Sequence, residues 1–145
     1  MGDHALVREG ARLDAASMVG HGAVIGRGCR IGARSRMMAG AILGQNTIFE
    51  EDVFCGPGLR AVDDITMGRH HGVGQLPVMT LRRACRIGAG VTLMAGIEIG
   101  EEATVGAGSV VTKHVPARTL VFGAPARFVR EVTDAELRER HPPRG

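Results

Sequence analysis

Residues suited to acid–base chemistry gather in one segment of the chain, Leu59 to Thr80. Its two histidines, His70 and His71, are adjacent, and an imidazole titrates close to neutral pH, so either could act as a general base. Adjacent residues of an extended segment point in opposite directions, so only one can face a given site, and we expect it to be His70. Asp63 and Asp64 could orient that imidazole or hold the ammonium group of a substrate. A surface histidine and an exposed acidic turn are the structural alternatives.

The charge of the chain favours a small anionic ligand over a polymer. The 145 residues carry a formal net charge of +3, Lys113 is the one lysine, and there is no Tyr or Trp. Without these rings there is little on which nucleic-acid bases could stack, and no arginine-rich run follows a phosphate backbone. Local groups of arginine fit a phosphorylated small molecule better. We therefore expect a small-molecule substrate, with neither nucleic acid nor a membrane as partner.

Cysteine usage and the N-terminal residues indicate a cytoplasmic protein. Cys29, Cys55 and Cys85 are odd in number and form no Cys-x-x-Cys pair, so we expect buried free thiols and no metal. The first residues contain no apolar stretch of signal-peptide length, and no segment is long enough to span a membrane.

A six-residue repeat must position the reactive groups, because it fills most of the chain. Every sixth residue from Val7 to Cys55 is apolar, and the residue two places before each is small, with Val53 as the exception. Side chains of a strand alternate between its faces, so both rows should point inward from short strands. Glycine often follows the larger residue, as at Gly20 and Gly26, where we expect a positive φ at the turn. Three such sides close a triangular coil, a parallel β-helix.

The repeat is interrupted once, after Gly58, and resumes at Leu81 with the same period as far as Val111. Long non-repeating segments inside a repeat are usually functional. Thr133-Asp134-Ala135-Glu136 is a capping box that should begin a short helix. We therefore expect an all-β single domain, 1–145, made of a first β-helix block (5–58), an excursion loop (59–80), a second block (81–116) and a C-terminal extended segment with a short helix (117–145).

Repeat and tail together resemble the hexapeptide-repeat acyltransferases. The tail reads Gly106-Ala107-Gly108-Ser109-Val110-Val111-Thr112-Lys113-His114-Val115-Pro116 and then Val121-Phe122-Gly123-Ala124-Pro125-Ala126-Arg127, which looks like the closing signature of that family. The resemblance implies a left-handed coil, an exception to the usual right-handed crossover. It also implies acetyl-CoA as the acyl donor and a homotrimer with active sites between its subunits.

Two segments, Asn46 to Pro57 and Thr80 to Arg83, resemble the amino-sugar N-acetyltransferases that act on nucleotide-linked sugars. This implies transfer of an acetyl group to an amine or hydroxyl of a small molecule, with an amino sugar or nucleotide-linked amino sugar as acceptor. Several relatives place a catalytic histidine in the loop that holds His70 and His71 here. Carried over residue by residue, the contacts to coenzyme A fall on the backbone of Ala89 and Ala107, on Thr112 and Lys113, and on Arg127 and Arg130.

Two other classes of protein use the same coil. A γ-type carbonic anhydrase holds zinc between subunits on three converging histidines, whereas His70 and His71 are adjacent. A non-catalytic scaffold would need neither Lys113 nor Arg127. Stoichiometric zinc in the purified protein would favour the first class, and a lack of stabilisation by acetyl-CoA would favour the second.

Overall fold

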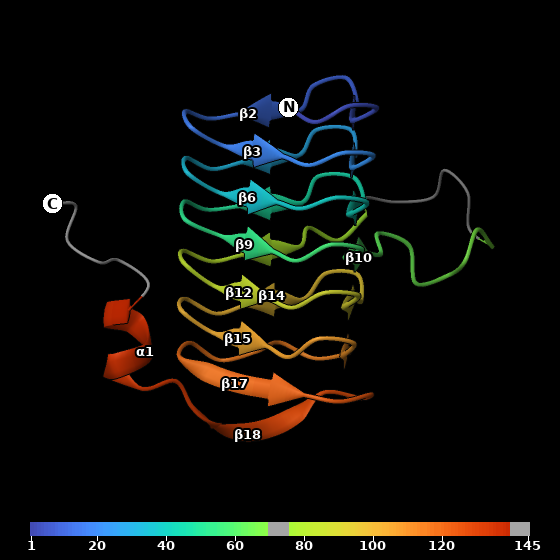
Figure 1. Cartoon of the computed structure of the whole chain (residues 1–145). Helices are drawn as coiled ribbons and strands as arrows, with labels where there is room; N and C mark the ends of the chain where they lie inside the picture. Colours follow the sequence, from blue (N-terminus) through green and yellow to red (C-terminus); the bar gives the residue numbers. More distant parts are fainter. Residues whose placement is uncertain (70–75, 140–145) are drawn as a thin grey trace, which may run out of the picture.

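The computed structural model is a three-sided coil of short parallel strands (Figure 1). It describes residues 1–69 and 76–139. The strands form three sheets of six, five and seven members. Strands β1 to β16 are two residues long. This follows from the six-residue period, because the turn at the end of each strand takes the other four residues.

The first sheet contains β1 (Leu6–Val7), β4 (Val24–Ile25), β7 (Ile42–Leu43), β10 (Arg60–Ala61), β13 (Thr92–Leu93) and β16 (Val110–Val111). The second contains β2 (Arg12–Leu13), β5 (Arg30–Ile31), β8 (Ile48–Phe49), β11 (Thr80–Leu81) and β14 (Glu98–Ile99). The third contains β3 (Met18–Val19), β6 (Arg36–Met37), β9 (Phe54–Cys55), β12 (Arg86–Ile87), β15 (Thr104–Val105), β17 (Thr119–Phe122) and β18 (Arg127–Glu131).

Strands one full turn of the coil apart stack in parallel register. Leu6 pairs with Val24, and Val24 pairs with Ile42, so one turn takes 18 residues in this part of the chain. In Figure 1 the front strands run to the right and the rear strands to the left as the chain descends from the N-terminus, which makes the coil left-handed. The predicted fold class, an all-β left-handed parallel β-helix with a protruding loop and a short C-terminal helix, is confirmed.

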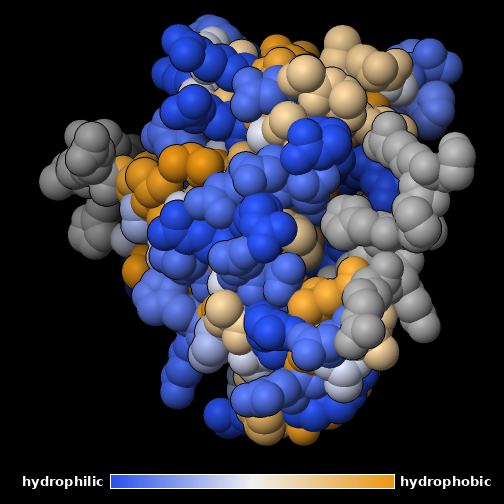
Figure 2. Space-filling model, turned by 90° about the vertical axis from the view of Figure 1, so that its left-hand side faces the viewer, coloured by the Kyte–Doolittle hydropathy of each residue, from blue (hydrophilic) through white to orange (hydrophobic). Residues whose placement is uncertain are grey.

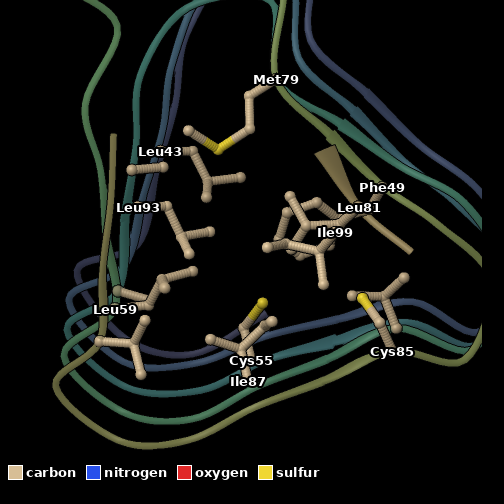
Figure 3. Packing of buried hydrophobic residues seen from close by; sticks show 14 of the residues in the cluster. Leu43, Phe49, Cys55, Leu59, Met79, Leu81, Cys85, Ile87, Leu93 and Ile99 are labelled. Carbon is tan, nitrogen blue, oxygen red and sulfur yellow. The ribbon is translucent and has the colours of Figure 1, made fainter. Parts of the chain in front are cut away.

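Both predicted inward rows line the interior of the coil from Val19 onward, whereas Leu13, in the first turn, is 41% exposed. Figure 3 shows Leu43 and Leu93 from the first sheet, Phe49 from the second and Cys55 and Ile87 from the third, all directed to a common centre. The side chains at these positions are 0–2% exposed. Because side chains from all three sides meet at one centre, medium-sized apolar residues fill the narrow core without Trp or Tyr.

The three cysteines are free and buried, as the sequence predicts. Burial among apolar side chains raises the pKa of the Cys85 thiol to about 12 and that of Cys55 well above its ordinary value. These thiols are therefore part of the core and are not nucleophiles.

Each side of the coil ends in a corner, named here by the residues that directly follow its strands. Corner 1 follows the first sheet and carries Arg8, Gly26, Gly44, Val62, Met94 and Thr112. Corner 2 follows the second sheet and carries Asp14, Gly32, Glu50, Arg82 and Gly100. Corner 3 follows the third sheet and carries Gly20, Met38, Gly56, Gly88 and Gly106.

The corner glycines do not supply the positive φ that we expected, and that prediction is wrong. Positive φ occurs two residues later, for example at Gly22 and Gly28, and non-glycine residues such as Asn46 also adopt it. The corner glycine is required by close approach instead. A Cβ atom on Gly26 would lie 2.7 Å from the carbonyl oxygens of both Leu43 and Gly44 on the next turn of the coil.

The excursion lengthens the connection between β10 and β11 at corner 1. The chain leaves the coil after β10 and re-enters it at β11 (Figure 1). The first and last residues of the predicted 59–80 segment are therefore part of the coil. Leu59 is fully buried in the core, and Arg60 pairs with Ile42 of β7. His70 and His71 lie outside the described residues.

The C-terminal segment closes the base of the coil with a hairpin. Strand β17 pairs in parallel with β15 and antiparallel with β18, and helix α1 (Asp134–Glu139) follows. The predicted capping box forms: the Thr133 amide donates to Glu136 Oε2 at 2.7 Å, and the Glu136 amide donates to Thr133 Oγ1 at 3.3 Å. Within 1–69 and 76–139 no helix has the length and apolar character needed to cross a membrane.

The two roles of glycine can be separated by paired substitutions. Gly26→Ala forces a Cβ against the next turn and should lower the free energy of unfolding by about 3 kcal/mol. Gly40→Ala places a Cβ in open space at a φ of 67° and should cost about 1 kcal/mol. Urea unfolding of both variants measures the difference. Equal losses, or a larger loss in Gly40→Ala, would contradict the close-approach explanation.

Candidate active site

Ala89 and Ala107 stack one above the other at corner 3. Both are exposed, and the Gly108 amide donates to the Ala89 carbonyl at 2.8 Å. In the described part of the chain neither the Ala89 nor the Ala107 amide has an acceptor. Gly88 allows this arrangement, since a Cβ there would lie 2.5 Å from the Ala107 nitrogen. The corner thus offers two outward amide donors in a column to a ligand lying along it.

Thr112 and Lys113 are exposed at corner 1. The first sheet runs from corner 3 to corner 1, so they lie at the opposite end of that sheet from Ala107. Ala107 precedes strand β16, and Thr112 follows it. No carboxylate within the described ranges pairs with the Lys113 ammonium group. One copy of the chain therefore does not bring the amide column of corner 3 together with Lys113, because the first sheet separates them.

Arg127 and Arg130 both lie on β18, but their surroundings differ. Arg127 is exposed opposite Phe122, and no partner for it occurs among the residues that the structure describes. Arg130 donates two hydrogen bonds to the Glu136 carboxylate, at 2.9 and 2.8 Å. The hydrogen bonds from Arg130 lower the pKa of Glu136, which also accepts bonds from Thr133. A phosphate would have to displace a carboxylate from Arg130, whereas Arg127 is free to bind one.

The β17–β18 hairpin lies next to the amide column. The Phe122 ring covers Gly106, the residue before Ala107, where it occupies the space that a Cβ would need. This contact sets Arg127, which is paired with Phe122, near the lower end of corner 3. Ala89, Ala107 and Arg127 therefore lie along one edge of the molecule, as a long ligand would require.

Asp63 is the first residue of the excursion and is half-buried. Its Oδ2 atom accepts a hydrogen bond from the backbone N–H of Gln45 at 3.0 Å, and its Cβ covers Gly44. The adjacent Asp64 instead closes a turn, accepting bonds from the Thr66 amide and the Gly68 amide at 2.7 and 2.8 Å. Asp63 is thus held at corner 1, and its relation to His70 and His71 lies outside the described residues.

Corner 2 carries a charge network that the sequence analysis missed. Arg82 pairs with Glu50 and with Glu98, each at 2.8 Å, and the Arg83 amide donates to the second Glu50 oxygen at 2.7 Å. These groups, with His114, line a hollow of about 680 Å³. Figure 2 faces this corner and shows a predominantly hydrophilic surface. The network ties β8 to β11, the strand with which the chain re-enters the coil.

The charges at corner 2 satisfy one another. The hydrogen bond from Arg82 lowers the pKa of Glu98, and the Glu98 amide donates to His114 Nδ1 at 2.9 Å. Arg34 makes two 2.8 Å bonds to Asp52 further along the corner, and Arg83 pairs with Glu101. This corner therefore acts as a structural clamp. No three His, Cys, Asp or Glu side chains converge on a metal site within the described ranges.

Arg8, Arg27 and Gln45 are further residues that sequence reasoning did not select. They line a second hollow, at corner 1, together with Asp63. Positions 27, 45 and 63 are each one turn of the coil apart, so an 18-residue spacing is the signal that could have found them.

Two family models match the repeat segments. The model of the bacterial transferase hexapeptide (six repeats) covers residues 79–113, and that of the hexapeptide repeat of succinyl-transferase covers 22–50. The 22–50 match lies in the first predicted block, and the 79–113 match begins at the last two residues of the predicted excursion and continues into the second block.

Curated relatives with named activities match over part of their length. Serine acetyltransferase of Buchnera aphidicola is 44% identical over 54 residues, which is 37% of this chain and 20% of that protein. Galactoside O-acetyltransferase of Lactococcus lactis is 38% identical over 52 residues, 36% of this chain and 25% of that protein. The matched part is thus a quarter or less of each of these two relatives.

Solved structures share the coil over most of this chain. GDP-perosamine N-acetyltransferase of Caulobacter crescentus, in complex with CoA and GDP-perosamine, superposes with a TM-score of 0.69 at 22% identity, over 88% of this chain and 54% of the other. Serine acetyltransferase of Brucella abortus gives 0.57 at 26% identity, over 86% and 41%. With the repeat models, these relatives confirm the predicted resemblance to the hexapeptide-repeat acyltransferases.

The corner 2 clamp predicts a pH-dependent loss of stability in Arg82→Gln. Because Arg82 lowers the pKa of folded Glu98, the pair stabilises the protein above the ordinary glutamate pKa of about 4.3 and ceases to do so as Glu98 is protonated at lower pH. The variant should melt below wild type at pH 7, and the difference should narrow toward pH 3. Arg12→Gln, an exposed change on the same sheet, is the control. Equal melting temperatures for the two variants at pH 7 would contradict the clamp.

Proposed function

We propose that the protein is an acetyl-CoA-dependent acyltransferase that transfers an acetyl group to an amine or hydroxyl of a small molecule. The observation that carries the proposal is a set of free donors at corner 3, at corner 1 and on strand β18. The Ala89 and Ala107 amides and the Lys113 and Arg127 side chains have no partner among the described residues. Relatives of the chain that are named acetyltransferases, some of them bound to CoA or acetyl-CoA, support the class.

These donors fit the chemistry of coenzyme A. Its pantetheine arm carries amide carbonyls, which outward backbone N–H groups along corner 3 can bind. Its phosphates need cations, which Lys113 and Arg127 supply. Thr112 adds a hydroxyl beside Lys113. Arg130 remains part of the expected contact set, although binding there would compete with Glu136.

The proposed donor site needs a second copy of the chain. The amide column lies at corner 3 and Lys113 at corner 1, on opposite ends of the first sheet. Rotation about an axis parallel to the coil would bring corner 3 of one copy against corner 1 of the next and complete the site. A closed ring of three identical contacts, a homotrimer, satisfies this for every copy.

The proposed reaction combines transfer of the acetyl group with transfer of a proton from the acceptor. During transfer the new bond forms between the acceptor nitrogen or oxygen and the acetyl carbon, the carbon–sulfur bond breaks, and the CoA thiol leaves. The proton of the acceptor passes to a base, for which His70 or His71 is the candidate, and a proton is returned to the thiolate. Asp63 is placed at the start of the excursion, where it can hold an ammonium group.

An amino sugar, free or nucleotide-linked, is the proposed acceptor. The support is the resemblance of the 46–57 and 80–83 segments to amino-sugar N-acetyltransferases, together with the Caulobacter crescentus structure, which is a complex with CoA and GDP-perosamine. The carboxylate of Asp63, at the start of the excursion, can bind the ammonium group of such an acceptor.

The donor site predicts a specific loss of acetyl-CoA affinity. Lys113→Ala and Arg127→Ala should each weaken binding about tenfold, since each removes one phosphate partner. Arg30→Ala, which removes an exposed arginine from the outer face of the second sheet, should leave the affinity unchanged. Calorimetric titration with acetyl-CoA measures all three. Absence of acetyl-CoA binding by wild type, or equal affinity in all variants, would contradict the proposed donor site.

If His70 is the base, alanine variants of the two histidines should differ in kcat. His70→Ala should lower kcat about 100-fold or more, while His71→Ala should change it little, because adjacent side chains point apart. CoA release with glucosamine as acceptor gives kcat. If both variants keep full turnover, neither histidine is the base, and the result favours a substrate-assisted route.

A further inference from the structure

Corner 1 holds a hollow of about 240 Å³ just before the chain departs into the excursion. Arg8, Arg27, Gln45 and Asp63 line it. They come from successive turns of the coil, spaced by about 4.8 Å. Asp63 lies on the last of these turns and begins the excursion, which leaves the coil after β10 in Figure 1. The hollow therefore adjoins the loop that carries the candidate base.

Gly26 and Gly44 line this hollow together with Val24 and Leu43, and neither glycine position has room for a side chain. A Cβ on Gly26 would lie 2.7 Å from the Gly44 oxygen, and one on Gly44 would lie 2.6 Å from the Asp63 Cβ. The close stacking of the coil thus keeps the hollow open between the charged side chains of its rim.

The two ends of the hollow carry opposite charges. Arg8 is exposed and has no carboxylate partner in the described part of the chain, and Arg27 binds Glu9 at 2.6 Å. At the other end the Asp63 carboxylate accepts one hydrogen bond, from the backbone N–H of Gln45, and pairs with no cation among the described residues. Corner 2 is different, since its arginines and glutamates neutralise one another.

We propose that this hollow is the acceptor site, and that the acceptor carries an amine and an anionic group on one small molecule. Asp63 binds the ammonium group, and Arg8, with Arg27 beside it, binds a phosphate or diphosphate. An amino-sugar phosphate or a sugar nucleotide has both groups. This inference rests on the proposed acyltransferase function and extends it, because it states where the acceptor binds and which charges it must carry.

The charge pattern explains why both groups are required. An exposed arginine binds a phosphate through charge-assisted hydrogen bonds, which are stronger than those to neutral groups. The backbone N–H of Gln45 binds Oδ2 of Asp63 and holds the side chain in place. The other carboxylate oxygen, Oδ1, remains for the amine. An acceptor with an amine but no phosphate would leave Arg8 unpaired. A phosphate alone would approach Asp63 with a like charge.

The experiment compares two probes that differ in one phosphate. Glucosamine 1-phosphate and glucosamine are titrated calorimetrically into wild type, Arg8→Gln, Asp63→Asn and Arg12→Gln, without acetyl-CoA. Wild type should bind the phosphorylated probe about tenfold more tightly than glucosamine. Arg8→Gln should lose this preference, Asp63→Asn should weaken both probes, and Arg12→Gln, an exposed arginine outside the hollow, should match wild type.

The result that overturns the proposal is a phosphate preference that survives in Arg8→Gln, or no preference in wild type. Titration of acetyl-CoA into the same variants separates this from failure of the proposed function. If acetyl-CoA binds but Arg8→Gln keeps the preference, the acceptor site is wrong and the acyltransferase proposal stands. If acetyl-CoA does not bind, the proposed function fails, while loss of the preference in Arg8→Gln still supports an amino-phosphate site.

Discussion

The structure depends on the close stacking of successive turns of the coil. Parallel strands must pair at a fixed spacing, so each residue of the repeat lies over the residue one turn later. At the corners this spacing leaves no room for some side chains, which is why Gly26 packs directly on the backbone of Leu43 and Gly44. The same constraint groups other residues into columns. A functional group at one corner is therefore neighbour to groups far away in sequence.

The three corners use this arrangement differently. Corner 2 pairs its charges internally around Arg82 and so clamps the coil where the chain returns from the excursion. Corner 3 presents the amides of Ala89 and Ala107 with no internal acceptor in the described part of the chain. Corner 1 leaves Arg8 and Lys113 unpaired within the same residues. The groups available for binding thus lie at corners 1 and 3, which flank the first sheet, and corner 2 provides stability.

The fold was predictable because its signal is a period. Within each block the inward residues, such as Ile25 in the first and Leu93 in the second, recur at every sixth position. This spacing fits neither an α-helix nor a simple alternating strand. The reason for the corner glycines was not predictable from a turn preference, because the clash lies between turns of the coil. For the same reason the contact of Asp63 with Gln45 was missed. The tail residues were selected by resemblance, which could not show that Ala107 and Lys113 lie at opposite ends of one sheet.

A crystal structure of the protein with coenzyme A tests the central claim most directly, because that claim is a binding site divided between two corners. The account predicts that CoA lies along corner 3, that its amide carbonyls accept hydrogen bonds from Ala89 and Ala107, and that Lys113 of a second copy reaches its phosphates. CoA held by a single chain, or bound in the hollow at corner 2, would contradict it.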